Sequence, residues 1–365
     1  AAALSDESRQ IGAEIKKPEE QLHQVEAELK ALMLTVPGIP LPGTPVGSTD
    51  ADNQEVRRWG EPRKVDFPLR DHVELMAAHG WANFEGPRKF AGSRSYALTG
   101  GAVLLEMAIL RLALEHVTAT GFTPVSPPVM VRENAMEGTG FFPIGREDSY
   151  SIERDGLFLV GTSEVGLVSL HRDEILPADA LPIRYAGISP CFRREAGAAG
   201  RDTRGLYRVH QFNKVEQVVL CANSPQVSDM EHERLLSNAE QILQKLELPY
   251  RVALACTGEL GLGQVRKHEV ETWMPSRNAY SETHSCSTLY DFQARRSNIR
   301  YRTPEGDIRF VHSLNNTAIA TPRILIALLE NHQEADGSIR IPAALRPYVG
   351  AEVLRPGADV AQKRG

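Results

Sequence analysis

The sequence predicts an α+β fold, in which an antiparallel β-sheet is flanked by helices and is preceded by part of a coiled-coil helix. A heptad repeat of apolar residues over 1–36 predicts the coiled-coil helix. A segment rich in Pro and Gly over 37–54 predicts a linker. After it, helical patterns mix with short strand-like runs that recur as hairpin pairs, without the strand–helix–strand rhythm of a parallel sheet. The helical patterns lie at about 99–120, 226–247 and 317–333.

The composition is that of a globular protein. With 365 residues, 42% of them hydrophobic and 24% charged, the chain has room for one or two domains with a core, which excludes a disordered or collagen-like protein. It contains no run of about 18 apolar residues and no apolar signal segment, so we expect no membrane partner and a cytoplasmic location. The four cysteines form no Cys-x-x-Cys pair, so no zinc is expected and a reducing compartment is favoured. Because the net charge is −6, any contact with nucleic acid must depend on a local basic patch.

The segment 1–36 carries its apolar residues on one seam. The seam residues are spaced alternately four and three apart, namely Leu4, Ser8, Ile11, Ile15, Pro18, Leu22, Val25, Leu29, Leu32 and Val36. One helix alone cannot bury such a seam, so it predicts a partner helix, from another chain or from a missing segment. The chain opens without a methionine, which favours a missing upstream piece. We expect Pro18 to kink or break the helix, at a cost of roughly 3 kcal/mol. An amphipathic helix packed on the main domain is the alternative.

The main domain is expected at 55–365, and its densest polar signal lies between Arg184 and Leu220. We expect a strand over 181–195, a glycine-containing loop over 196–205 and a returning strand over 206–220. Alternate residues of a strand share a face, so Arg193 lies with Glu195. On the returning strand the shared face carries Arg208, His210, Phe212, Lys214 and Glu216. This pattern suits a ligand-binding surface, and a solvated face with cross-strand ion pairs is the alternative.

Three shorter segments carry further signals. A buried helix is expected to begin near Pro322, which suits the first helical turn. Arg323 then lies at the positive end of the helix dipole, where a cation is disfavoured, so we expect it to face an anion or an aromatic ring. An arginine that extends to solvent is the alternative. A strand at 157–165 ends in Thr-Ser-Glu, whose spacing fits a capping box poorly, although polar strand ends are common in loops. At Tyr280–Ser287, a carboxylate beside hydroxyls suits a hard cation such as Mg²⁺.

Taken together, these segments resemble the motifs of the class II aminoacyl-tRNA synthetases, and among them the seryl-tRNA synthetases of the bacterial type. Gly121–Pro128 resembles motif 1, which implies a homodimer through this segment. Phe192–Glu216 resembles motif 2, and Asn315–Arg323 resembles motif 3, apart from Ala and Thr-Pro where many relatives have Gly and Val-Gly. Thr162–Glu164 is similar to the family's Thr-x-Glu serine-binding segment. The resemblance covers nearly the whole chain.

The resemblance implies a role for each matching residue. L-serine is expected to bind Thr162, Ser163, Glu164, Arg193, Glu216 and Thr317. ATP is expected to bind Arg193, Arg194, Glu195, Val209, Phe212, Glu282, Thr283, His284, Ser285 and Arg323. The metal ligands are expected to be Glu282 and Ser285, holding Mg²⁺, and the catalytic residues Arg193, Glu282 and Arg323. Within the ATP site, Phe212 would stack on adenine with Arg323 on its other side. The loop cations Arg201 and Arg204 suit a tRNA backbone.

The implied reaction is the ATP-dependent formation of seryl-adenylate and transfer of the seryl group to tRNA-Ser, and also to tRNA-Sec, with release of pyrophosphate and AMP. Residues 1–36 would be the remnant of a helical tRNA-binding arm. Two alternatives stay open. One is a non-catalytic paralogue, and the other is a ligase that loads another amino acid or a carrier protein.

Overall fold

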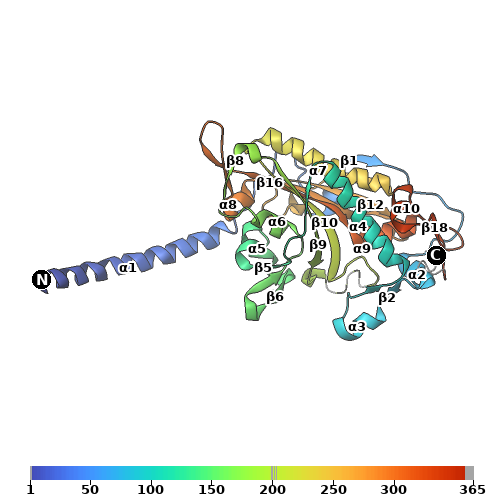
Figure 1. The fold of residues 1–365 in the computed structure, drawn as a ribbon, viewed down its shortest axis with the longest axis horizontal. Helices are drawn as coiled ribbons and strands as arrows, with labels where there is room; N and C mark the ends of the chain where they lie inside the picture. The colour runs from blue at the N-terminus through green and yellow to red at the C-terminus, as the bar shows by residue number, and fades with distance from the viewer. Residues whose placement is uncertain (1, 199, 201, 203, 358–365) are drawn as a thin grey trace. The chain divides into compact units, whose positions relative to one another are not determined.

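The computed structural model describes residues 2–198, 200, 202 and 204–357, which divide into two compact units, Ala1–Pro37 and Gly38–Gly365 (Figure 1). The first unit consists of the helix α1 (Ala2–Met33). The second unit contains a large mixed sheet with helices packed on it. In the described part of the chain, no helix combines the length and the apolar character that a membrane crossing requires.

Helix α1 continues through Pro18, so the expectation that this proline breaks the helix is wrong. A proline in a helix interior removes one backbone hydrogen bond, and in a helix as exposed as this one water can satisfy the freed carbonyl. The seam side chains are between 50% and 67% exposed, namely Ile11, Ile15, Leu22, Val25, Leu29 and Leu32. The heptad therefore presents an apolar stripe to solvent in this unit.

The second unit is built on an eight-stranded sheet. In order across the sheet, the strands are β1 (Gln54–Trp59), β11 (Tyr250–Leu254), β12 (Arg266–Met274), β13 (Ala279–Tyr290), β16 (His312–Ala320), β10 (Gln211–Cys221), β9 (Ile183–Phe192) and β4 (Thr123–Val125). All neighbours pair antiparallel except β4, which pairs parallel with β9. The predicted α+β fold with an antiparallel sheet is confirmed.

Three long helices pack against this sheet, α4 (Gly101–Ala119), α7 (Pro225–Lys245) and α9 (Thr321–Asn331). They share one apolar core with the strands, to which Ile109, Leu236 and Leu325 contribute fully buried side chains. All three predicted helices are present. The third begins at Thr321 and not at 317, because 317–320 pairs with β10 as the end of β16. Pro322 lies in the first helical turn, where its missing N–H has no intrahelical partner to lose.

Smaller elements complete the unit. The shorter helices are α2 (His72–His79), α3 (Glu85–Ala91), α5 (Glu133–Thr139), α6 (Glu164–Ser169), α8 (Phe292–Ser297) and α10 (Arg346–Val349). The shorter strands are β2 (Ala82–Asn83), β3 (Ala97–Leu98), β5 (Met130–Arg132), β6 (Tyr150–Ile152), β7 (Leu157–Leu159), β8 (Ile175–Pro177), β14 (Arg300–Arg302), β15 (Ile308–Phe310), β17 (Ile339–Arg340) and β18 (Val353–Leu354).

From Gly38 on, the Pro- and Gly-rich segment belongs to the second unit. The Gly38 N–H donates to the Leu262 carbonyl at 2.7 Å, the Leu41 N–H donates to the Val265 carbonyl at 2.8 Å, and the Pro45 carbonyl accepts from the Thr257 N–H at 2.9 Å. These bonds hold the segment along the loop before β12. At its end, β1 begins at Gln54, the last residue of the predicted linker.

The motif 2 hairpin has shorter strands than expected, because β9 ends at Phe192 and β10 begins at Gln211. The exit of the connection is fixed against α2, where the Leu206 N–H donates to His72 Nε2 at 3.2 Å. Gly205 has a φ of +72°, and a Cβ added there would lie 2.1 Å from His72 Nε2, so only glycine fits. Of the two loop cations, Arg204 Nη1 pairs with Asp71 at 2.5 Å, and Arg201 lies outside the described residues.

Candidate active site

Two adjoining hollows open on one face of the sheet, with about 640 and 780 Å³ of empty space. The first hollow is lined by Arg193, Glu195, Leu206, Tyr207, Arg208, Val209, Phe212, Lys214, Glu282, Thr283, His284, Ser285, Thr317, Ala320, Pro322 and Arg323. The second hollow is lined by Thr139, Gly140, Phe141, Thr162, Glu164, Arg193, Lys214, Glu216, Gly261, Leu262, Gly263, Gln264, Ser285, Ser287, Leu289, Asn315 and Thr317. They share Arg193, Lys214, Ser285 and Thr317, so a ligand in one hollow can touch a ligand in the other.

Strand β10 supplies one wall through simple alternation. Phe212 and Lys214 line the first hollow, and Lys214 and Glu216 line the second, which brings these three side chains together as predicted. His210 lies before the strand and lines neither hollow; its Nδ1 is 3.0 Å from the Arg193 carbonyl oxygen. Arg193 follows the end of β9, and its guanidinium carbon lies 5.3 Å from the centre of the Phe212 ring.

Strands β13 and β16 reach the hollows through two β-bulges. Between the pairs Val270–His284 and Glu271–Glu282, Thr283 is an extra residue on β13. This bulge lets Glu282 and Ser285 line the same hollow, although residues three apart face opposite sides of a regular strand. On β16 the register shifts in the same way between Ile319 and Thr317.

The bulge residues themselves are buried. Thr283 Oγ1 lies 2.7 Å from Thr272 Oγ1 and 2.8 Å from His284 Nδ1. Burial lowers the pKa of His284 to about 4, so this ring is neutral at pH 7. These two residues line the first hollow without adding charge to it.

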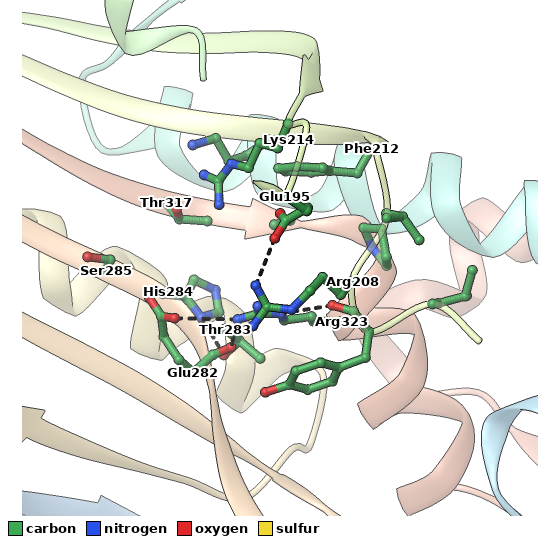
Figure 2. A pocket seen from close by; sticks show the side chains of 16 residues that line it. Glu195, Arg208, Phe212, Lys214, Glu282, Thr283, His284, Ser285, Thr317 and Arg323 are labelled. Carbon is green, nitrogen blue, oxygen red and sulfur yellow. Dashed lines mark hydrogen bonds and ion pairs between the residues drawn. The ribbon is translucent and has the colours of Figure 1, made fainter. Parts of the chain in front are cut away.

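In the first hollow, two arginines are paired with two carboxylates (Figure 2). Arg208 Nη1 lies 2.7 Å from Glu195 Oε2, and Glu195 lies between Phe212 and Arg208 in the view. Arg323 Nη1 donates to the Glu282 carbonyl at 2.6 Å and lies 3.4 Å from its carboxylate. The Arg323 guanidinium also lies 4.6 Å from the centre of the Tyr207 ring. The prediction that Arg323 faces an anion or an aromatic ring is therefore confirmed, since it faces both.

The second hollow contains two buried carboxylates. Glu164 Oε1 accepts hydrogen bonds from Gln293 Nε2 at 2.7 Å and from Asn315 Nδ2 at 2.9 Å. Burial and, after it, the nearby charge of Glu216 raise the pKa of Glu164 to about 7, against the opposing effect of the two amide hydrogen bonds and of Lys214. Glu164 is thus close to its titration point at neutral pH.

Lys214 balances the second carboxylate. Its Nζ forms an ion pair with Glu216 and donates to Thr162 Oγ1 at 2.7 Å. The side chains of Lys214 and Glu216 are only 6% and 3% exposed, so this pair is shielded from water. Thr317 Oγ1 completes the cluster, 3.4 Å from Glu216 Oε2.

Among the residues predicted to bind serine, ATP or Mg²⁺, all line one of the two hollows except Ser163 and Arg194. Ser163 lies behind the second hollow, where its Oγ donates to the Gly187 carbonyl at 3.3 Å. A Cβ added to Gly187 would lie 2.5 Å from that Oγ, so glycine permits this close approach. Arg194 turns away from the first hollow, and its Nη1 donates to the Glu147 carbonyl at 2.9 Å.

Several residues of the site were not predicted as ligand-binding. Lys214 and Asn315 could have been found by alternation, because each lies two residues from a predicted site residue, Glu216 and Thr317 respectively. Tyr207 was not singled out, and Arg208 was placed on the predicted face without a role. Gln293 reaches Glu164 from α8, and no local pattern in the sequence signals it.

Comparison with known proteins agrees with this geometry. The family model described as "tRNA synthetase class II core domain (G, H, P, S and T)" matches residues 150–332. The serine–tRNA ligase of Deinococcus radiodurans is 53% identical over 352 residues, covering 96% of this chain and 83% of its own length. The serine–tRNA ligase of a Synechococcus strain is 47% identical, covering 97% and 81%. The chain belongs to the seryl-tRNA synthetase family.

Solved structures agree with this membership. The seryl-tRNA synthetase of Pyrococcus horikoshii complexed with ATP superimposes with a TM-score of 0.90 at 39% identity, covering 96% of this chain and 83% of that one. The cytoplasmic serine–tRNA ligase of Naegleria fowleri in complex with AMP gives a TM-score of 0.88 at 32% identity, covering 94% and 82%. The resemblance inferred from four short motifs is thus confirmed across nearly the whole chain, which is a class II aminoacyl-tRNA synthetase.

Proposed function

We propose that this chain activates L-serine with ATP and transfers the seryl group to tRNA. The observation that supports this best is the junction of the two hollows at Arg193 and Lys214. One hollow carries an aromatic ring and arginines suited to a nucleotide, and the other carries carboxylates and hydroxyls suited to a small amino acid. Arg193 lines both, which is where an α-phosphate and a serine carboxylate must meet.

In the first hollow we propose that adenine stacks on Phe212, with Arg323 on its other face. Glu195 would accept from the adenine amino group, and Val209 would line the pocket. Arg208 and Arg323 would exchange their present carboxylate partners for contacts with the nucleotide.

Glu282 and Ser285 offer a carboxylate and a hydroxyl oxygen to the same hollow, a donor set that fits Mg²⁺. No group of three or more candidate ligands occurs among His, Cys, Asp and Glu in the described residues, so nucleotide phosphates and water would complete the coordination. When bound there, the cation would neutralise phosphate charge.

In the second hollow, Thr162, Glu164, Glu216 and Thr317 would hold the ammonium and hydroxyl groups of serine. Alanine and glycine would leave a buried carboxylate without its partner, and threonine would add a methyl group to a small pocket. Loss of a hydrogen-bond partner discriminates strongly, so no editing domain is required.

The first step then needs positioning more than proton transfer. The serine carboxylate is ionised at pH 7 and attacks the α-phosphorus directly. A bond forms between the carboxylate oxygen and the α-phosphorus, and the bond to the β-phosphate bridging oxygen breaks, so pyrophosphate leaves with the electron pair. Arg193 would stabilise the negative charge that builds on the α-phosphate oxygens. The 3′-terminal hydroxyl of tRNA would then attack the acyl carbon and release AMP.

We also propose the partners that the family implies. The exposed apolar seam of α1 suits a second helix in a tRNA-binding arm at 1–36, with 37–54 as its connection and 55–365 as the catalytic domain. Arg204 would contact the tRNA backbone, for tRNA-Ser and also tRNA-Sec. A homodimer through Gly121–Pro128 and a cytoplasmic location complete the proposal, and the four buried free cysteines are consistent with a reducing compartment.

The test is amino-acid-dependent pyrophosphate exchange with ATP and Mg²⁺ across a panel of amino acids. We expect exchange with serine, and much weaker exchange with alanine, glycine and threonine. Exchange with no amino acid would favour the non-catalytic paralogue, and stronger exchange with another amino acid would reject serine specificity. Transfer of radiolabelled serine to tRNA, and not to a carrier protein, would separate the remaining alternative.

A further inference from the structure

The amino-acid hollow already contains an ammonium group. Lys214 Nζ donates a hydrogen bond to Thr162 Oγ1 at 2.7 Å and forms an ion pair with Glu216. Both partners are groups that the proposed function assigns to serine binding. Thr162 Oγ1 also accepts from the Glu164 N–H at 3.3 Å, so both of its acceptor positions are filled. An incoming serine therefore finds part of its binding site occupied by the protein's own lysine.

A second ammonium group would compete with Lys214 for Glu216 and Thr162. Like charges a few ångströms apart repel strongly in a low-dielectric site, and the Lys214 side chain is only 6% exposed. For serine to bind Glu216, the Lys214 ammonium has to move to another anion. Its backbone is fixed in β10, but its four-carbon stem is flexible, unlike the planar fork of an arginine.

The position of Lys214 indicates where that anion lies. Lys214 lines the first hollow as well as the second, and in Figure 2 it lies on the same wall as Phe212, opposite Glu282 and Thr283. A nucleotide phosphate bound beside Arg193, at the junction of the hollows, would lie where the Lys214 side chain could turn toward it. Glu216 offers Lys214 one carboxylate, and a nucleotide would offer it a second, more strongly charged partner.

We propose that Lys214 is the counterion of Glu216 in the amino-acid hollow, and that ATP draws it toward the α-phosphate so that Glu216 and Thr162 become free for the ammonium of serine. This inference rests on the proposed function. It assigns to one buried side chain a switch between two partners, and it predicts that ATP and serine bind with positive coupling. Because coupling between two ligands is reciprocal, serine must tighten nucleotide binding by the same factor.

The experiment is calorimetric titration of serine into the full chain with Mg²⁺, with and without α,β-methylene-ATP. This analogue is needed because activation breaks the α–β bond, and the methylene bridge prevents adenylate formation. In the wild-type chain we expect the serine Kd to fall at least about ten-fold when the analogue is present. The reverse titration, analogue into chain with and without serine, should give the same factor.

The variant is Lys214→Met, which keeps the length and apolar stem of the side chain and removes the ammonium. We expect serine alone to bind it at least as tightly as it binds the wild-type chain, and the analogue to change the serine Kd less than about three-fold. Lys267→Met is the matched control. Lys267 is also a buried lysine paired with a carboxylate two residues on, Nζ to Glu269 Oε1 at 2.7 Å, but it lines neither hollow. It should keep the wild-type coupling.

The outcomes are distinct. If the wild-type chain catalyses serine-dependent pyrophosphate exchange but shows no coupling, the inference is wrong and the proposed function stands. If Lys214→Met keeps the coupling, so that the serine Kd rises by the same factor with and without the analogue, Lys214 has only a structural role and the inference is wrong. If Lys214→Met does not fold, the wild-type titration still decides whether coupling exists, and Lys214→Gln replaces it as the variant. If the wild-type chain shows no exchange with serine, the proposed function fails and the inference fails with it.

Discussion

The two hollows use charge in different ways. In the first hollow, the pairs Arg208–Glu195 and Arg323–Glu282 are partly open to water, with the arginine side chains 27% and 26% exposed. In the second hollow, Lys214 and Glu216 are 6% and 3% exposed. An exposed ion pair contributes about 0–1 kcal/mol, so a nucleotide can replace its members at little cost. Removing one member of a buried pair costs about 3–5 kcal/mol, so the second hollow tolerates little change.

The elements that build the hollows differ in the same direction. The first hollow is formed largely by strand ends and by the connection between β9 and β10. The second is bordered by the end of α5 and the start of α6 as well as by the sheet, and Gln293 of α8 donates to Glu164. Partly exposed ion pairs that a ligand can replace suit a substrate that many proteins share, and buried carboxylates suit selection of one small amino acid.

Arg193 lines both hollows, so its loss should have the largest effect. We expect Arg193→Ala to lower serine-dependent pyrophosphate exchange about a thousand-fold, because Arg193 would contact both the α-phosphate and the serine carboxylate and Lys214, the other cation that lines both hollows, lacks a planar fork that can bind two oxygens at once. Arg194→Ala is the control, because the Arg194 guanidinium donates to the Glu147 carbonyl and lines neither hollow. Exchange at the wild-type rate in Arg193→Ala would show that Arg193 does not take part in the activation step.

Glu216→Gln should separate the two hollows. The amide keeps the shape of the side chain but removes the charge that holds the serine ammonium, so we expect the serine KM to rise about a hundred-fold. The ATP KM should change only a few-fold, because Glu216 does not line the first hollow. Exchange kinetics with each substrate varied in turn measure both values. Equal increases would place Glu216 outside the serine site.

The β10 wall could be predicted from the sequence, because alternation is a local rule. The same rule places Arg194 on the opposite side from Arg193 and Glu195. Although β9 ends at Phe192, Arg194 does point away, to the Glu147 carbonyl, and lines neither hollow, unlike the ATP-binding role that the family resemblance implied for it. The three long helices and the antiparallel sheet followed from equally local patterns.

The rest of the site depends on features that no local pattern encodes. Glu282 and Ser285 share a hollow only because Thr283 bulges out of the β12–β13 register, and a regular strand would have separated them. Gln293 reaches Glu164 from 129 residues away in the sequence. Ser163 lies between two residues of the second hollow in the sequence, yet its hydroxyl turns to the Gly187 carbonyl on the far side. Bulges, long-range contacts and helix starts are decided by tertiary packing.

The buried carboxylate of Glu164 predicts a pH dependence confined to the second hollow. Its pKa of about 7 means that it is mostly protonated at pH 6 and mostly ionised at pH 8. Because the ionised form attracts the serine ammonium, the serine KM should fall about ten-fold between pH 6 and pH 8. The ATP KM should stay nearly constant over the same range.

The stability effect has the opposite sign. The folded protein binds this proton more tightly than the unfolded chain, whose pKa is near 4.5, so this group's contribution to the free energy of unfolding decreases as pH rises from 4.5 to 7. Glu164→Gln should flatten the serine KM profile and reduce the loss of stability over this range. A serine KM in Glu164→Gln that still falls with pH would assign the titration to another group.

The smallest effect on binding is expected for Ser163→Ala, although Ser163 lies between two residues of the serine site. Its hydroxyl bonds to the Gly187 carbonyl and not into the hollow, so the serine KM should change less than about two-fold. The free energy of unfolding, measured by urea denaturation, should fall by about 1 kcal/mol, the usual contribution of one buried hydrogen bond. Thr162→Val makes the matched comparison, because Thr162 Oγ1 accepts from Lys214 inside the hollow and its loss should raise the serine KM clearly. Similar KM values for these two variants would contradict the assignment of Thr162 to the hollow and of the Ser163 hydroxyl to the Gly187 carbonyl behind it. They would mean that the direction of the side chain does not decide which of these two residues contributes to serine binding.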